Sequence, residues 1–234
     1  MSGPALPPAD VMPGAEPFAF PGSGPNGRTG VLLVHGFTGT PMSMRPWGEH
    51  LAEAGFAVRC PLLPGHGTRW QDCNLSSHDQ WTTAVDEAFD ALAADCDRVF
   101  VAGLSMGGTL SIRLAEVRPD DVAGLVLVNP ALLTQRLDAK LLPMIAKITG
   151  SWAPIASDIK KPGITEPANS QALLDGVSST DVSEVVLENS YHVATLDNDA
   201  PLIFAGSTMW SSRLWNTITG AVIRPRSARV TDQS

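Results

Sequence analysis

The sequence predicts an α/β fold, in which a mostly parallel sheet carries helices on both faces. Two observations support this prediction. Short apolar runs bounded by turn residues alternate along the chain with stretches of helical spacing, and runs such as Val31–Val34 lack the polar alternation of a half-exposed strand. The 234 residues suffice for one domain with a sizeable core. In such sheets, functional residues are expected in the loops that follow the carboxyl ends of strands.

Composition narrows the possible functions. The chain is 44% hydrophobic and 17% charged, as globular proteins are, and its formal net charge of −8 offers no basic face for nucleic acid. No apolar run reaches the roughly 18–20 residues of a transmembrane helix, and the first 28 residues show no signal-peptide pattern. The three cysteines lack CxxC spacing, which favours reduced thiols, a cytoplasmic location and no metal site. The oligomeric state is left open.

The first half of the chain gives two strands and two helices. Residues 1–28 are rich in Pro and Gly and predict an irregular lead-in. A helix is expected where apolar residues recur at helical spacing before Gly55, and a second one after the capping box formed by Ser77 and Gln80. The expected ranges are strand 31–34, helix 44–54, strand 56–60, loop 61–68 and a helix ending near residue 94.

The chain after residue 94 gives three strands and one helix. The strands 99–102 and 125–128 are continuous apolar runs, and the helix 108–117 between them ends before Pro119. A late strand is expected at 184–188. The predicted domain therefore covers 29–204, with a cap over about 131–166, and residues 205–234 form an atypical tail that has no steady helical period.

The strongest motif is G-x-S-x-G, formed by Gly103, Ser105 and Gly107 between a predicted strand and a predicted helix. A sharp turn at this place lifts the serine hydroxyl above the sheet edge, and the glycines allow the strand and the helix to approach closely. Ser105 is the predicted nucleophile.

A second loop, His35-Gly36-Phe37, follows the first predicted strand. Acyl transfer needs backbone N–H groups aimed at the developing oxyanion. The N–H groups of Phe37 and Met106 are the predicted donors, and His35 is expected to shape its loop rather than to transfer protons.

His192 is the predicted general base. Of the five histidines, it alone lies late in the chain after a strand, which gives the order Ser–acid–His that such a fold requires. His50, His66 and His78 lie on a helix, in a loop and in a helix cap, where structural roles are more common.

Four segments resemble the α/β-hydrolase carboxylesterases, most closely the bacterial carboxylesterase and monoacylglycerol-lipase-like branch. The segments are VLLVHGFTGTPMSMRPW, PLLPGHGTRWQD, AGLSMGG and ENSYHVATLDND. The resemblance implies Ser105 as nucleophile, His192 as base, and Phe37 and Met106 as oxyanion donors. It also implies hydrolysis of short- to medium-chain esters or monoglycerides without a cofactor. A peptidase or an acyltransferase would share this machinery.

The triad acid is missing from the pattern. No β-branched apolar run lies between Leu133 and Val182, although the family carries there a strand that ends in the acid. Glu166 is the nearest substitute by position, and Asp158 and Asp175 are more distant ones. Without that strand, backbone groups in the middle of the sheet lack partners, so the chain is expected to fold with a rearranged sheet or hardly at all. The chain is then either an active serine hydrolase, or an impaired remnant or binding module that lacks the triad acid.

Overall fold

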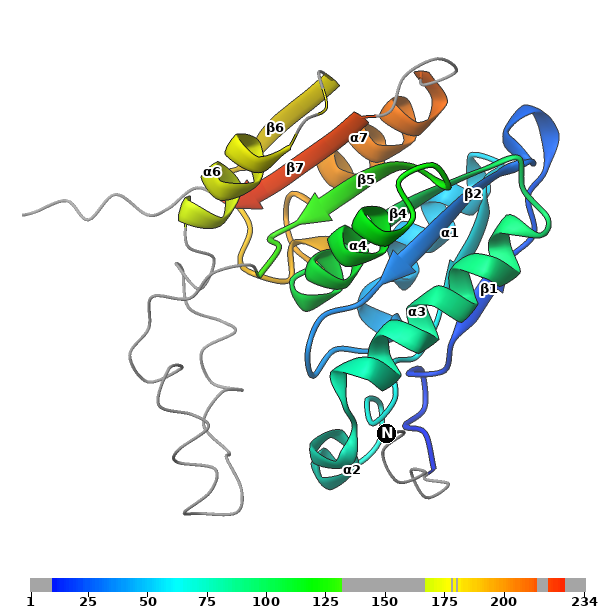
Figure 1. The fold of residues 1–234 in the computed structure, drawn as a ribbon, viewed down its shortest axis with the longest axis vertical. Helices are drawn as coiled ribbons and strands as arrows, with labels where there is room; N and C mark the ends of the chain where they lie inside the picture. The colour runs from blue at the N-terminus through cyan, green and yellow to red at the C-terminus, as the bar shows by residue number, and fades with distance from the viewer. Residues whose placement is uncertain (1–9, 132–166, 178, 180, 214–218, 226–234) are drawn as a thin grey trace, which may run out of the picture.

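The computed structural model describes residues 10–131, 167–177, 179, 181–213 and 219–225. Within them, seven strands form one sheet in the order β1-β3-β2-β4-β5-β7-β6 (Figure 1). The strands are β1 (Phe18–Phe20), β2 (Thr29–Val34), β3 (Ala57–Cys60), β4 (Arg98–Leu104), β5 (Val122–Val128), β6 (Asp181–Leu187) and β7 (Thr219–Pro225). Only β1 runs antiparallel to its neighbour, and the other five pairings are parallel. The predicted α/β class with a mostly parallel sheet is confirmed.

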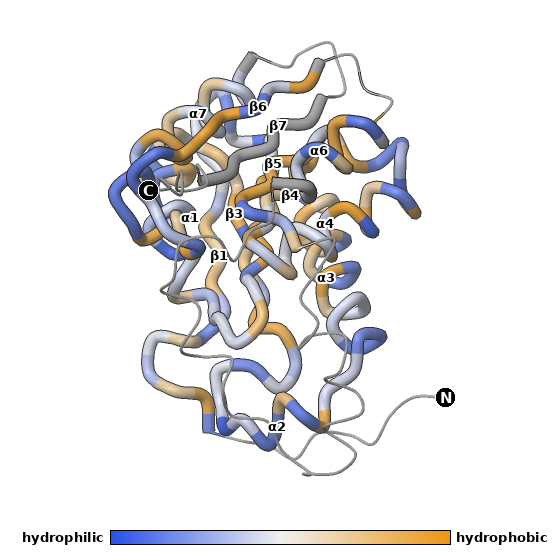
Figure 2. The backbone as a smooth tube through the Cα atoms, turned by 90° about the vertical axis from the view of Figure 1, so that its left-hand side faces the viewer, coloured by the Kyte–Doolittle hydropathy of each residue, from blue (hydrophilic) through white to orange (hydrophobic). Residues whose placement is uncertain are grey.

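Helices cover both faces of the sheet (Figure 1). Side chains alternate along β2, so Val31 and Leu33 belong to the cluster that α1 and α7 cover, whereas Leu32 and Val34 belong to the cluster under α3 and α4. The α-helices are α1 (Arg45–Glu53), α2 (Trp70–Leu75), α3 (His78–Ala93), α4 (Met106–Val117), α6 (Pro167–Gly176) and α7 (Ala200–Arg213); the short 3-10 helices are η1 (Gly24–Asn26), η2 (Pro41–Ser43) and η4 (Ala194–Leu196). Figure 2 shows the apolar residues concentrated in the central strands. Burial on both faces explains why these strands are continuously apolar.

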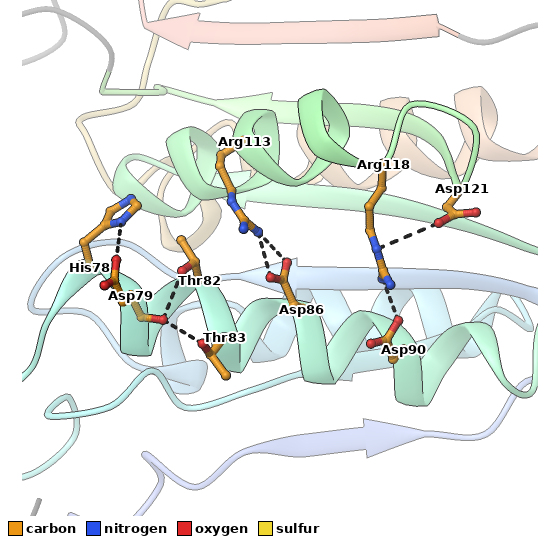
Figure 3. Close-up of polar contacts among 9 residues, drawn as sticks. All are labelled: His78, Asp79, Thr82, Thr83, Asp86, Asp90, Arg113, Arg118 and Asp121. Atoms are coloured by element: carbon orange, nitrogen blue, oxygen red, sulfur yellow. Dashed lines mark hydrogen bonds and ion pairs between the residues drawn. The ribbon is translucent and has the colours of Figure 1, made fainter. Parts of the chain in front are cut away.

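Ion pairs join α3 to α4 outside the core (Figure 3). One guanidinium nitrogen of Arg113 contacts both carboxylate oxygens of Asp86, at 2.6 and 2.8 Å. Arg118, directly after the last residue of α4, contacts one carboxylate oxygen of Asp90 at 2.5 Å. Both pairs link the helix that follows the G-x-S-x-G turn to its neighbour. They add modest stability because their side chains are partly exposed.

The predicted elements are present with shifted ends. The strands expected at 31–34, 99–102 and 125–128 are each extended at their amino end, and the late strand spans Asp181–Leu187 instead of 184–188. Helices near 44–54, 78–94 and 108–117 are confirmed, and Ser77 and Gln80 form the capping box. The short helix α2 was not predicted.

The two ends of the chain differ from expectation. The lead-in 1–28 contains β1, whose residues pair with β3 in an antiparallel register. The tail 205–234 contains the end of α7 and the strand β7, which lies between β5 and β6. The gap expected between these two strands is therefore filled from the C-terminal segment, and the sheet is rearranged rather than open.

The predicted cap (131–166) lies outside the described residues except for Ala131. No described helix is long and apolar enough to span a bilayer.

Candidate active site

Ser105 lies in the turn between β4 and α4, as the motif predicted. Its φ of +56° is in the left-handed region that non-glycine residues rarely adopt. The flanking glycines make this turn possible: a Cβ atom on Gly103 would lie 2.4 Å from the carbonyl oxygen of Gly107, and one on Gly107 would lie 2.0 Å from that of Val34. The strain and the close approach together present the Ser105 hydroxyl at the carboxyl end of the sheet.

The loop after β2 approaches Ser105 from the neighbouring strand. A Cβ atom on Gly36 would lie 3.2 Å from the Cβ atom of Ser105. Phe37 follows in this loop, and Met106 is the first residue of α4, where N–H groups have no intrahelical acceptor. Met106 thus follows Ser105 in the chain, and Phe37 follows Gly36, which lies close to Ser105 in space.

His35 fixes the shape of that loop. Its Nδ1–H donates to the carbonyl oxygen of Gly36 at 2.9 Å, and its Nε2 accepts the N–H of Leu63 at 3.1 Å. This pairing requires the neutral imidazole, and burial lowers the pKa of His35 to about 4. His66 is also buried, and its ring packs edge-on against those of His35 and Phe37. Both histidines therefore have the structural settings that were expected.

His192 reaches Ser105 from the loop after β6. Its Nε2 lies 2.9 Å from the Ser105 Oγ, although 87 residues separate the two in sequence. Two carboxylates of this region bind the main chain of the loop. Asp197 accepts the N–H of Tyr191 at 2.7 Å, and Asp199 accepts that of Asn189 at 2.8 Å. The sequence-predicted nucleophile and base are thus in hydrogen-bonding contact.

The other side of the His192 ring is unsatisfied. Its Nδ1 is buried and has no hydrogen-bond partner among the described residues. Burial lowers the pKa of His192 below its usual value of 6.5, with no carboxylate acting to raise it. Glu166, the sequence-based candidate for the acid, lies outside the described residues.

Asn129 is a site residue that the sequence analysis missed. It directly follows β5, is fully buried, and adopts a left-handed φ of +48°. Its Nδ2 donates to the carbonyl oxygen of His192 at 2.7 Å. The signal was available, because Asn129 is a polar residue at the carboxyl end of a predicted strand and precedes Pro130.

The site has the groups for acyl transfer: a serine hydroxyl bonded to an imidazole, beside a loop and a helix start that offer N–H groups. Among the described residues, no group of three or more His, Cys, Asp or Glu could hold a metal ion.

Comparison with known proteins identifies the family of the chain. A family model described as serine aminopeptidase S33 matches residues 25–162. A thermostable monoacylglycerol lipase from Bacillus sp. (strain H-257) is 36% identical, over 84% of this chain and 94% of that protein. The chain belongs to the α/β-hydrolase family of serine hydrolases. Its solved relatives include a metagenome-derived lipolytic enzyme, which is 34% identical and matches with a TM-score of 0.77 over 87% of this chain and all of that one.

A second α/β-hydrolase relative, a carboxylesterase from Bacillus subtilis (strain 168), is 31% identical over 44% of this chain and 41% of that protein. The alignment with the monoacylglycerol lipase spans 247 positions, more than the 234 residues of this chain. It must therefore include positions at which the lipase has residues that this chain lacks. This agrees with the expectation that a segment of the family pattern is missing here.

Proposed function

We propose that Ser105 and His192 are the catalytic nucleophile and base of a hydrolase that cleaves short- and medium-chain carboxylic esters, including monoacylglycerols. The observation that carries this proposal is the 2.9 Å contact between the Ser105 Oγ and the His192 Nε2. The chain is a serine hydrolase by family, and such a contact is what activates a serine hydroxyl.

The reaction proceeds through an acyl-enzyme. As the Ser105 oxygen attacks the ester carbon, its proton moves to the His192 Nε2, and the N–H groups of Phe37 and Met106 stabilise the oxyanion. The tetrahedral intermediate collapses as the imidazolium gives that proton to the leaving alcohol. A water molecule then gives a proton to His192 and attacks the acyl carbon, and as this second tetrahedral intermediate collapses the imidazolium returns that proton to the Ser105 Oγ, which releases the carboxylic acid and restores the hydroxyl. This chemistry needs neither a metal nor a cofactor.

The substrate class is supported by the relatives. The monoacylglycerol lipase aligns with most of the chain, and the solved relative is a lipolytic enzyme. Both the description of the matching family, a serine aminopeptidase, and the shared machinery keep peptide hydrolysis as the alternative reaction. We also propose a cytoplasmic location, because Cys60, Cys73 and Cys96 are all free thiols.

Two observations favour an impaired remnant: the unpartnered Nδ1 of His192, and the residues of the monoacylglycerol lipase that this chain lacks. The hydrogen bond on the other side of the ring favours the enzyme, because a remnant needs no contact between Ser105 and His192.

The deciding experiment labels the purified chain with a fluorophosphonate and measures the intact mass. We expect one adduct in the wild type and none in Ser105→Ala, because the probe reacts only with an activated hydroxyl. Ser212→Ala removes an exposed serine of α7 and is the matched control that should still be labelled. Absence of an adduct on the folded wild type would support the remnant.

The same variants distinguish the substrates. We expect release of fatty acid from a monoacylglycerol and hydrolysis of p-nitrophenyl butyrate, both lost in Ser105→Ala. Faster cleavage of an aminoacyl p-nitroanilide than of either ester would instead favour the peptidase.

A further inference from the structure

The segment Val128–Ala131 binds both members of the proposed catalytic pair. The N–H of Ser105 donates to the carbonyl oxygen of Val128 at 2.9 Å, and the N–H of Ala131 donates to that of Ser105 at 3.3 Å. Between these two contacts, the Asn129 side chain donates to the main chain of His192 at 2.7 Å. Asn129 is thus held at a fixed place between the nucleophile and the base.

The orientation of the Asn129 amide follows from its partner. The His192 carbonyl oxygen can only accept a hydrogen bond, so the NH₂ group of Asn129 must face it and the Oδ1 atom must point elsewhere. That Oδ1 is buried and has no partner among the described residues. An acceptor left unsatisfied inside a protein is destabilising, so such an atom calls for an explanation.

His192 has an unpaired donor that complements this unpaired acceptor. When its Nε2 accepts the Ser105 hydroxyl, its Nδ1 must bear the proton, and this N–H donor has no partner among the described residues either. One residue therefore has a buried unpaired donor, and a residue bonded to it has a buried unpaired acceptor.

We propose that Asn129 is the positioning residue for His192, with its side-chain oxygen accepting the imidazole Nδ1–H, directly or through one water, during proton transfer from Ser105. This inference rests on the proposed roles of Ser105 and His192. An amide can fix the tautomer and the orientation of the ring, which is one of the two tasks of a triad acid. It carries no charge, so it stabilises the imidazolium less well than a carboxylate would.

None of the described charged groups near His192 is hydrogen-bonded to its Nδ1. In its own loop, Asp197 and Asp199 are bonded to main-chain N–H groups, and Glu188 lies at the end of β6. The β2 loop contributes His35, which is neutral because burial lowers its pKa to about 4, and the turn around Ser105 and the end of β5 contribute no charge. Burial is the only cause of the lowered pKa of His192.

Two substitutions test the inference without forcing the backbone. Asp and Gly both tolerate the positive φ at position 129, so neither variant adds the strain that Ala would. Asn129→Asp supplies a carboxylate, whereas Asn129→Gly removes the amide. Asn198→Ala is the matched control, because it also removes an asparagine bond to a main-chain oxygen, that of Asn189, in the exposed part of the same region.

The readout is the pH profile of ester hydrolysis, with the melting temperature as the check on folding. We expect Asn129→Asp to move the acid limb of kcat/KM upward by about one pH unit, because a nearby negative charge raises the pKa of the base. Its kcat should rise by about tenfold, well within the roughly 10⁴ that separates a carboxylate from an amide in serine proteases. Asn129→Gly should lose about tenfold in kcat with little change in KM.

Wild-type kcat in Asn129→Gly, together with an unmoved acid limb in Asn129→Asp, would overturn the inference. A loss of activity in Glu166→Gln that exceeds the loss in Asn129→Gly would also overturn it, by assigning the orienting role to that carboxylate. Fluorophosphonate labelling separates this failure from that of the proposed function. Faster labelling of Asn129→Asp than of the wild type would support the inference, whereas the absence of labelling in both would refute the catalytic pair itself.

Discussion

At the scale of single residues, the site depends on two histidines in opposite settings. His192 is hydrogen-bonded to Ser105 and is proposed to gain and lose a proton in each catalytic cycle. His35 is bonded on both ring nitrogens and must remain neutral for its Nε2 to accept the N–H of Leu63. Burial lowers the pKa of both rings, but only His35 is held by partners on both sides.

The buried His35 predicts a pH-dependent stability. Its pKa is about 4 in the folded chain and near 6.5 when unfolded, so the unfolded state binds a proton first as the pH falls. The contribution of the neutral His35 to the free energy of unfolding is therefore present above pH 6.5 and declines as the pH falls toward 4. Between pH 7.5 and pH 5, His35 should account for a loss of about 2 kcal/mol in the free energy of unfolding.

Urea unfolding of the wild type and His35→Gln at these two pH values checks this expectation. The variant should be less stable at pH 7.5, and its stability should depend less on pH by about that amount. His78→Gln is the control, because the side chain of His78 is exposed at the start of α3. An equal decline in the wild type and His35→Gln would contradict the assignment of a neutral, bonded imidazole.

At the scale of elements, the turn from β4 to α4 decides whether Ser105 is presented at all. Gly107 brings the first turn of α4 against the carbonyl oxygen of Val34 at the end of β2. Such contact is possible only without a Cβ atom, and backbone atoms cannot move aside as a flexible side chain can.

We therefore expect Gly107→Ala to abolish fluorophosphonate labelling and to lower the melting temperature, because the added methyl group would lie 2.0 Å from the Val34 oxygen. Gly206→Ala in α7 is the matched control, since a Cβ atom there meets nothing within 4 Å. It should keep the label and raise the stability of its helix by up to about 1 kcal/mol. A labelled, wild-type-like Gly107→Ala would refute the close approach of helix and strand.

Some of these helices and strands could be predicted from the sequence, and others could not. Continuous apolar runs and the capping box of Ser77 and Gln80 are local signals, and they predicted β2, β4, β5 and the helices that flank Ser105. The G-x-S-x-G turn is also local. The predictions failed where non-local contacts decide: β1 is three residues long in a Pro-rich segment, and β7 gains its place only by pairing with strands distant in sequence. The position of Asn129 at the carboxyl end of a predicted strand marks it as a candidate site residue, but its bond to His192 joins residues distant in sequence and could not be predicted.

At the scale of the whole molecule, the sheet joins the two halves of the site. Ser105 follows β4 and His192 follows β6, and the path between these strands runs through β5 and then β7. β7 pairs with residues Gly124–Val128 on one side and Asp181–Leu187 on the other. Both neighbours would have unpaired backbone groups without it, which is costly inside a sheet.

Truncation tests this dependence. We expect a chain that ends at Arg213, and so lacks β7, to lose fluorophosphonate labelling, because β6 would lose the only strand to which it is paired in the described sheet and the His192 loop would lose its support. Hydrogen exchange should show faster exchange in β5, whereas β2 and β3 should stay protected because their pairings lie on the other side of β4. A chain that ends at Pro225 keeps Thr219–Pro225 and is the matched control, which should retain the label. If the shorter chain were labelled at the wild-type rate, β7 would not be what holds His192 against Ser105, and the contact between them would have to be maintained by the Asn129 bond and the loop carboxylates alone.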